Sequence, residues 1–173
     1  MLITNNSVLE KEFLHIIKEN QGIIHKVCNI YCNDQDDRDD LFQEIVAQLW
    51  KSFSSFREES KFSTWMYRVA LNTAITSFKK TKRRPDQNRL TVENFQLKDD
   101  SYNAETEDEI KNLHRAVAQL TGIEKSIILL FLEDKKYEDI AEITGITQNY
   151  VRVKMNRIKK KLKKFMETEE DQR

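Results

Sequence analysis

The side chains best suited to chemistry in this chain are amides and guanidinium groups that share one segment near the C-terminus. Between Gln148 and Lys164 there are eight basic residues and no acidic residue. On a helical wheel the apolar residues of this segment form one stripe within about 60°. The members of that stripe are Val151, Met155, Ile158 and Leu162. Asn and Arg hydrogen-bond base edges and Lys suits phosphates, so the opposite face predicts a contact with duplex DNA. The residues of that face are Asn149, Val153, Asn156, Arg157, Lys160 and Lys164.

The residues that precede this segment have the pattern of a helix-turn-helix. Ala141 is small where a second helix must cross the first, and Gly145 follows where the tight turn needs a positive φ. Thr147 is suited to cap the second helix. The alternative is a helical hairpin that contacts protein, but the basic outward face favours DNA.

A second candidate nucleic-acid surface lies in the N-terminal half. A helix predicted from Thr64 to Arg84 places an aromatic ring, an amide and basic groups within about 60° of one side, as single-strand binders do. Those residues are Trp65, Arg68, Asn72, Lys79 and Arg83, and five of the six residues from Lys79 to Arg84 are basic. Aromatic side chains at helical spacing also suit a core, and the wheel alone leaves both interpretations open.

Cysteine and histidine give no pattern of an enzyme or a metal centre. Cys28 and Cys32 share one side of a helical segment with His25, but a fourth ligand is missing. We therefore expect packed or half-buried thiols. The three histidines, His15, His25 and His114, have no paired nucleophile, and no Gly-rich phosphate loop is present. Neither a catalytic activity nor a cofactor is expected.

The composition places these motifs on helices. The 173 residues include 34% charged residues, only three Gly and one Pro, too few turn-formers for a multi-stranded β fold. Basic and acidic residues balance at 29 each. No apolar run approaches the roughly 18 residues of a membrane span, so we expect a soluble cytoplasmic protein without direct membrane contact.

Apolar periodicity predicts an all-α protein of two small helical domains joined by an acidic flexible linker. The predicted helices span residues 7–33, 36–53, 64–84, 109–121, 124–134, 137–144 and 148–165. Pro85 ends the third helix, and residues 85–108 have no periodicity and an excess of acid. The domains are therefore predicted at 1–84 and 109–173, with the linker between them.

Two sets of motifs resemble a known family. The run Asp40-Leu-Phe-Gln-Glu-Ile, with Phe62-Ser-Thr-Trp-Met-Tyr-Arg-Val-Ala-Leu-Asn72 after it, is similar to region 2 of bacterial sigma factors. The helix-turn-helix, followed by Arg157-Ile-Lys-Lys-Lys-Leu, is similar to region 4. The short length and the missing middle domain resemble the extracytoplasmic-function group.

The resemblance implies a protein that binds core RNA polymerase and directs it to promoters. The second helix would contact the clamp helices of the largest polymerase subunit through Asp40, Leu41, Gln43, Glu44 and Gln48. The third helix and the loop before it would open the minus-ten element and hold its non-template single strand, through Phe56, Trp65, Arg68, Asn72, Lys79, Lys80, Arg83 and Arg84. The last helix would read the minus-thirty-five duplex through Asn149, Tyr150, Arg152, Val153, Asn156, Arg157 and Lys160.

The resemblance also implies further partners. Region 4 would meet the flap region of polymerase, and members of this group are commonly held inactive by an anti-sigma factor that is often membrane-anchored. The competing class is a DNA-binding regulator that acts without polymerase. That class would explain the helix-turn-helix but leaves the face from Trp65 to Asn72 without a role, and no heptad pattern for a dimer is visible.

Overall fold

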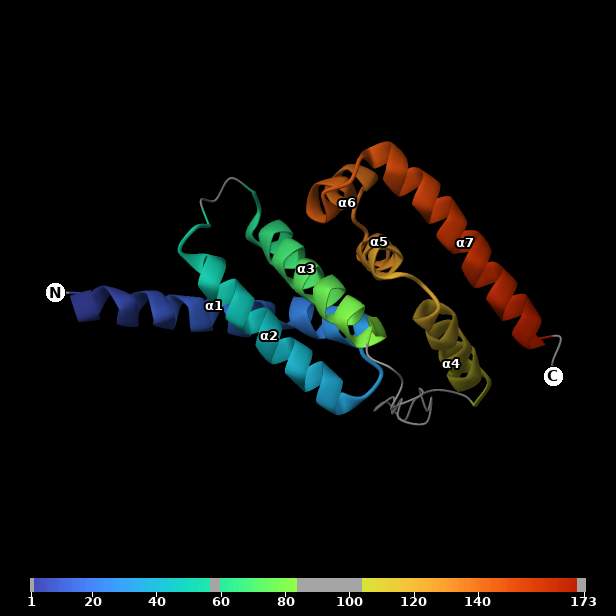
Figure 1. Ribbon diagram of the computed structural model, residues 1–173, viewed down its shortest axis with the longest axis horizontal. Helices are drawn as coiled ribbons and strands as arrows, with labels where there is room; N and C mark the ends of the chain where they lie inside the picture. The colour runs from blue at the N-terminus through green and yellow to red at the C-terminus, as the bar shows by residue number, and fades with distance from the viewer. Residues whose placement is uncertain (1, 57–59, 84–103, 171–173) are drawn as a thin grey trace.

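Every regular element in the described part of the chain is a helix, which confirms the predicted all-α class. The computed structural model describes residues 2–56, 60–83 and 104–170. Figure 1 shows the helices in chain order, and their bounds are α1 (Leu2–Tyr31), α2 (Gln35–Phe53), α3 (Phe62–Arg83), α4 (Ala104–Ala118), α5 (Gly122–Leu132), α6 (Tyr137–Thr144) and α7 (Gln148–Glu170). No helix in these ranges combines the length and the apolar character needed to cross a bilayer.

Helices α1, α2 and α3 pack on one another as an N-terminal unit. Each contributes apolar residues at helical spacing, so one stripe of each helix is buried. The buried residues with no exposed surface include Ile24, Val27, Ile45, Leu49 and Met66. Asp34 begins α2 as its N-cap, since its carboxylate accepts a hydrogen bond from the backbone N–H of Asp37 at 2.8 Å.

Helices α4 to α7 form a C-terminal unit that contains the predicted helix-turn-helix. The turn between α6 and α7 is made by Gly145 in the left-handed region, with φ 72° and ψ 23°, as the sequence predicted. Thr147 caps α7, because its hydroxyl accepts from the backbone N–H of Tyr150 at 3.2 Å. Helix α4 begins at Ala104, five residues earlier than predicted, so the end of the expected linker is helical. The preceding residues 84–103 lie outside the described part of the chain.

The two units pack against each other across α5. This helix contacts α6 and α7 on one side and α1 and α3 on the other, and Figure 1 shows it between α3 and α7. Its sequence, Gly-Ile-Glu-Lys-Ser-Ile-Ile-Leu-Leu-Phe-Leu, is apolar around most of its circumference. A helix of this kind is stable only when it is covered on all sides. The buried residues of both units therefore belong to one continuous core.

The turn at Gly145 and the helical position Gly22 give a matched pair of substitutions. A Cβ added at either glycine would meet no atom within 4 Å, so the two sites differ in backbone conformation alone. Gly145→Ala forces a left-handed alanine and should lower the free energy of unfolding by about 1–2 kcal/mol. Gly22→Ala, inside α1, should raise it by about 0.5–1 kcal/mol. Urea unfolding of both variants measures the difference, and equal effects would contradict the left-handed turn.

Candidate nucleic-acid interface

The first candidate surface is the outward face of α7. Its buried stripe contains Val151, Met155 and Ile158, none of which has exposed surface, as the wheel predicted. All seven residues expected to contact the minus-thirty-five duplex are exposed on the other side, namely Asn149, Tyr150, Arg152, Val153, Asn156, Arg157 and Lys160. Two of them are apolar or aromatic, Tyr150 at 44% and Val153 at 40% exposure. The structure thus brings these side chains together on one helix face.

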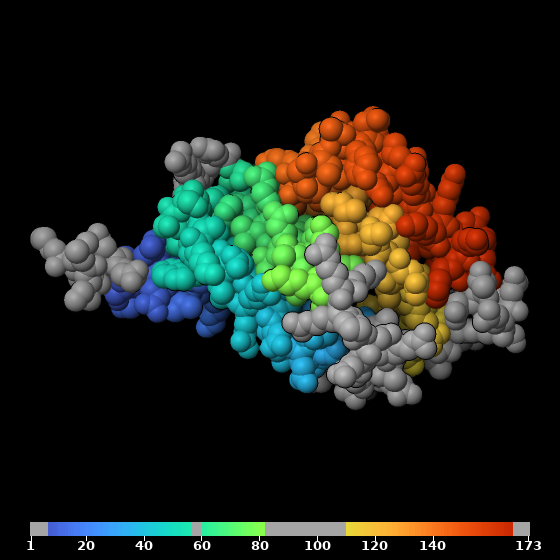
Figure 2. Space-filling view, viewed as in Figure 1, coloured from blue at the N-terminus to red at the C-terminus, as the bar shows by residue number. Residues whose placement is uncertain are grey.

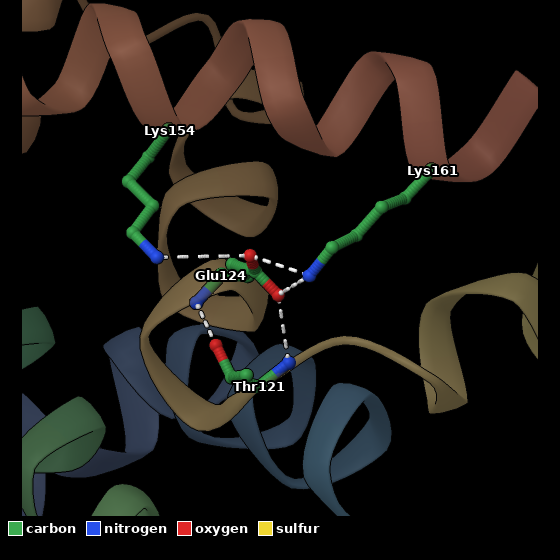
Figure 3. Close-up of polar contacts among 4 residues, drawn as sticks. All are labelled: Thr121, Glu124, Lys154 and Lys161. Atoms are coloured by element: carbon green, nitrogen blue, oxygen red, sulfur yellow. Dashed lines mark hydrogen bonds and ion pairs between the residues drawn. The ribbon is translucent and has the colours of Figure 1, made fainter.

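A buried carboxylate fixes α7 against α5. Glu124, which is 2% exposed, forms a capping box with Thr121: the Thr121 N–H donates to Glu124 Oε2 at 3.0 Å, and the Glu124 N–H donates to the Thr121 hydroxyl at 3.4 Å. Figure 3 shows two lysines of α7 that reach down to the same carboxylate. Lys161 Nζ lies 2.8 and 2.9 Å from its two oxygens, and Lys154 Nζ lies 3.8 Å from Oε1.

This arrangement ties the direction of α7 to the start of α5. Burial by itself would raise the pKa of Glu124, but the hydrogen bonds from Lys161 and from Thr121 outweigh it and hold the pKa below its ordinary value. The carboxylate is therefore charged at neutral pH and pairs with α7 at two points, Lys154 and Lys161, which lie about two helical turns apart. The Nζ atom of Lys154 also lies 5.5 Å from the centre of the Tyr150 ring, so the ion pairs of Glu124 are connected to the exposed face of α7.

The second candidate surface is on α3. Arg68, Asn72, Lys79 and Lys80 are exposed, as predicted. Arg68 is engaged, however: its guanidinium donates to the backbone carbonyl of Glu142 in α6 at 2.8 Å. The side chain of Arg83 and the whole of Arg84 lie outside the described part of the chain.

The aromatic residues beside α3 form a connected, half-buried cluster. The ring centre of Trp65 lies 5.0 Å from that of Phe56 and 5.2 Å from that of Phe62. Phe53 extends the cluster to Phe13 of α1, 5.2 Å away. These rings pack on one another, as the core interpretation predicts, while Phe56, Phe62 and Trp65 keep some exposed surface. Contact of these rings with a nucleic-acid base stays a prediction.

The third candidate surface is the polar side of α2. Asp40, Gln43 and Glu44 are exposed and Gln48 is half-buried. Leu41 departs from the expectation that it contacts a partner, because it is only 3% exposed and lies in the core. The helical period explains the correction: Leu41, Ile45 and Leu49 follow one another at four-residue spacing and form the buried stripe.

The cysteines lie in the packing, as expected. Burial is the main cause that raises the pKa of Cys28 to about 11 and that of Cys32 to about 12, so both thiols keep their protons at neutral pH. The ring of His25 lies against Phe42, with 4.8 Å between the ring centres. Within the described ranges no group of three or more His, Cys, Asp or Glu side chains is placed to hold a metal ion.

Sequence reasoning missed the roles of Glu124 and of the residues between the two units. The Thr-x-x-Glu spacing from Thr121 to Glu124 is the signature of a capping box and could have been read from the sequence. No local signal marks the long-range pairs, such as Lys26 with Glu133 at 2.6 Å, because their partners are about a hundred positions apart.

Comparisons with known proteins agree on one family. The chain matches the models for Sigma-70 region 2 over residues 16–84 and Sigma-70, region 4 over residues 110–162. It is 30% identical over 156 residues to the RNA polymerase sigma factor SigV of Bacillus subtilis, covering 90% of each chain. It is also 30% identical over 159 residues to the ECF RNA polymerase sigma-E factor of Haemophilus influenzae, covering 86% of this chain and 84% of that protein.

Two solved structures share the fold. A chain of the co-crystal structure of the sigma factor RpoE with the anti-sigma factor NepR from Bartonella quintana superposes with a TM-score of 0.67 at 17% identity, covering 91% of this chain and 98% of that chain. The structure of CnrH with the cytosolic domain of CnrY gives a TM-score of 0.65 at 13% identity, covering 92% and 90%.

The ion pairs of Glu124 with Lys161 and Lys154 give a pH-dependent prediction. Glu124→Gln should lower the free energy of unfolding by about 1–3 kcal/mol at neutral pH, since it removes a charged acceptor from Lys161. The folded pKa is depressed, so this stabilisation is present above the unfolded value of about 4.3 and is lost as pH falls through the folded pKa. In urea titrations, the difference between wild type and variant should therefore hold from neutral pH down to the unfolded value and shrink in stronger acid.

A matched control uses the exposed pair between Glu167 and Lys163, whose charged atoms lie 3.6 Å apart. Glu167→Gln should change stability by less than about 1 kcal/mol. An undiminished effect of Glu124→Gln in strong acid would show that its cost is not electrostatic.

Proposed function

Since this chain belongs to the extracytoplasmic-function group of sigma-70 RNA polymerase sigma factors, we propose that it reads its promoters through the outward face of α7 and the exposed side of α3. As a sigma factor it binds core RNA polymerase and directs promoter-specific initiation of transcription. The observation that carries the residue assignment is the division of α7, in which an apolar stripe is buried while amide and guanidinium groups face outward.

For the minus-thirty-five element, α7 lies in the major groove of the duplex. Arg157 and Asn156 are the side chains whose donors match guanine and adenine edges. Val153 and Tyr150 offer apolar contact beside them. Lys160, farther along the helix, contacts phosphates and sets the register of the helix without reading sequence.

For the minus-ten element, α3 and the aromatic cluster hold the non-template strand. Opening costs about 1.4 kcal/mol for each base step, and stacking on an aromatic ring returns about 1–3 kcal/mol per base. The rings of Phe56 and Trp65 already contact each other, so a captured base replaces part of this ring contact. Asn72 supplies hydrogen bonds to the base, while Lys79, Lys80, Arg83 and Arg84 meet phosphates.

The polar side of α2 is the proposed surface for the clamp helices of the largest polymerase subunit. Asp40, Gln43, Glu44 and Gln48 contribute to it, and Leu41 supports it from the core. The C-terminal unit meets the flap region. The cytoplasm, where polymerase works on bacterial DNA, is then the site of action. The proposal involves no catalytic residue, cofactor or metal ion.

An anti-sigma factor is a further proposed partner. The support comes from the two structures of similar fold, RpoE and CnrH, each of which is in complex with another protein: the anti-sigma factor NepR for the first and the cytosolic domain of CnrY for the second. The second name points to a partner with a part outside the cytosol, which suits a membrane-anchored regulator.

The function is tested by abortive transcription with purified core polymerase on a genomic promoter library, with and without this protein. We expect transcripts that start downstream of one shared two-part motif and depend on the protein. DNA binding without polymerase and without dependent transcripts would instead favour a regulator that acts alone.

Two alanine substitutions separate the two DNA contacts. Asn72→Ala should impair opening of the minus-ten region in permanganate footprints and leave assembly with core polymerase intact. Arg157→Ala should cost about 1–3 kcal/mol of binding to the matched minus-thirty-five duplex and relax the preference at one base pair. Each variant serves as the control for the other. A uniform loss for Arg157→Ala across all sequences would assign this side chain to phosphate.

A further inference from the structure

Lys154 differs from the other basic residues of α7 in its burial. Its side chain is only 16% exposed, whereas Arg152, Arg157 and Lys160 are exposed. A lysine ordinarily keeps its ammonium group in water and covers apolar surface only with its aliphatic stem. A lysine that contacts phosphates is expected at the surface, so the position of Lys154 indicates another role.

Lys154 belongs to a row of four residues along one edge of α7. Tyr150, Lys154, Arg157 and Lys161 follow one another at spacings of four, three and four residues, which places them on one side of the helix. Figure 3 shows both lysines of this row pointing toward Glu124. Tyr150 and Arg157 are exposed instead. Along this edge, side chains that anchor α7 therefore alternate with side chains that face outward.

The ammonium group of Lys154 lies between a buried carboxylate and an exposed ring. Its Nζ atom is 3.8 Å from Oε1 of Glu124 and 5.5 Å from the centre of the Tyr150 ring. The second distance is within the range of cation–π attraction. Glu124 is buried and is itself held by the backbone N–H of Thr121. Lys154 thus connects a fixed group of the core to a side chain on the outward face.

Tyr150 is the residue that gains from this connection. It is the third residue of α7, and its backbone N–H donates to the hydroxyl of Thr147 at 3.2 Å. Its ring is 44% exposed, and an exposed ring has to be immobilised when it binds a ligand. A ring that is already held in one orientation loses less conformational entropy on binding. The helix cap fixes the backbone of Tyr150, and Lys154 restrains its ring.

Tyr150 and Val153 form an apolar spot on an outward face that is otherwise polar. Val153 follows Tyr150 by three residues and is 40% exposed, so the two side chains are neighbours on the helix. Figure 2 shows the orange region that contains α6 and the first turns of α7 at the surface of the molecule. In the major groove, the apolar group that distinguishes base pairs is the C5-methyl group of thymine.

We propose that Lys154 is a positioning residue for the minus-thirty-five contact: anchored by Glu124, it holds the Tyr150 ring beside Val153, and these two apolar side chains recognise the methyl group of one thymine. This inference rests on the proposed function, in which α7 lies in the major groove. Lys154 itself contacts neither a base nor a phosphate. It acts on sequence preference through Tyr150.

The test measures promoter binding by holoenzyme assembled from core polymerase and the full-length chain. The promoter is the one found in the transcription experiment. Competitor duplexes carry deoxyuridine in place of single thymines of the minus-thirty-five element, or 5-methylcytosine in place of single cytosines. Each change removes or adds one methyl group and leaves base pairing intact. Lys154→Met removes the charge but keeps a long unbranched side chain, whereas Lys154→Arg keeps a cation.

Lys161→Met is the matched control for a role that is only structural. Lys161 pairs with the same carboxylate at the shorter distance of 2.8 Å, so its loss should loosen α7 at least as much as the loss of Lys154. Lys161 lies about three helical turns from Tyr150, however, and should not affect the ring. Equal loss of the methyl preference in both variants would show a general loosening of α7 and would overturn the positioning role.

We expect removal of one thymine methyl to weaken wild-type binding about fourfold, the effect of one buried methyl group, and Lys154→Met to reduce this factor below about twofold. Tyr150→Ala should reduce it as well, whereas Lys154→Arg should preserve it. Adding Lys154→Met to Tyr150→Ala should cause no further loss, because a residue that acts through another is not additive with it. Additive losses would contradict the proposal.

The salt dependence of binding separates positioning from phosphate contact. Loss of one phosphate contact lowers the slope of log affinity against log salt concentration by about 0.9. Lys160→Met, at the proposed phosphate contact, should show this decrease, and Lys154→Met should leave the slope unchanged. A decrease of the same size for Lys154→Met would assign this lysine to phosphate and would overturn the positioning role.

Failure of this inference can be told apart from failure of the proposed function. An absence of transcripts that depend on the wild-type protein would refute the promoter function. Normal transcription without a methyl effect at any position of the minus-thirty-five element would refute only the inference. The same holds for a methyl effect that Lys154→Met leaves intact.

Discussion

The burial of α5 is the constraint on which the rest of the structure depends. The helix is apolar on nearly every side, and Ile127 and Leu130 have no exposed surface. Neither unit covers such a helix alone, since α6 and α7 occupy one side and α1 and α3 occupy the other. The hydrophobic effect therefore stabilises the packed arrangement of the units as well as each unit by itself. The polar contacts at its edges give this apolar packing a defined geometry.

One buried carboxylate of α5 orients α7. Glu124 lies at the start of α5 and pairs with Lys161 and Lys154, which α7 presents on its inner side. The remaining lysines and both arginines of α7 are exposed. The basic segment is thus divided by position: Lys154 and Lys161 anchor the helix to the protein, and the other basic side chains lie at the surface. A single buried carboxylate suffices for this division because its pairing offsets the cost of its burial.

The two proposed DNA-binding surfaces differ in how far the free protein already presents them. Helix α7 has its contacts outward and its apolar stripe covered. On α3, by contrast, Arg68 donates a hydrogen bond to a backbone carbonyl of α6. The ring of Trp65 packs against the ring of Phe56. Reading a duplex requires only docking, whereas holding a single strand requires that existing contacts be replaced.

The sequence by itself determined what depends on near neighbours in the chain. Helical periodicity predicted all seven helices, the buried stripe from Val151 to Ile158 and the outward face of α7, and Gly145 predicted the left-handed turn. Only the tertiary structure decided that Arg68 caps another helix and that Glu133 holds Lys26 and Tyr67. Helical patterns depend on residues three or four positions apart, whereas these contacts join residues from distant helices whose approach is set by the burial of α5.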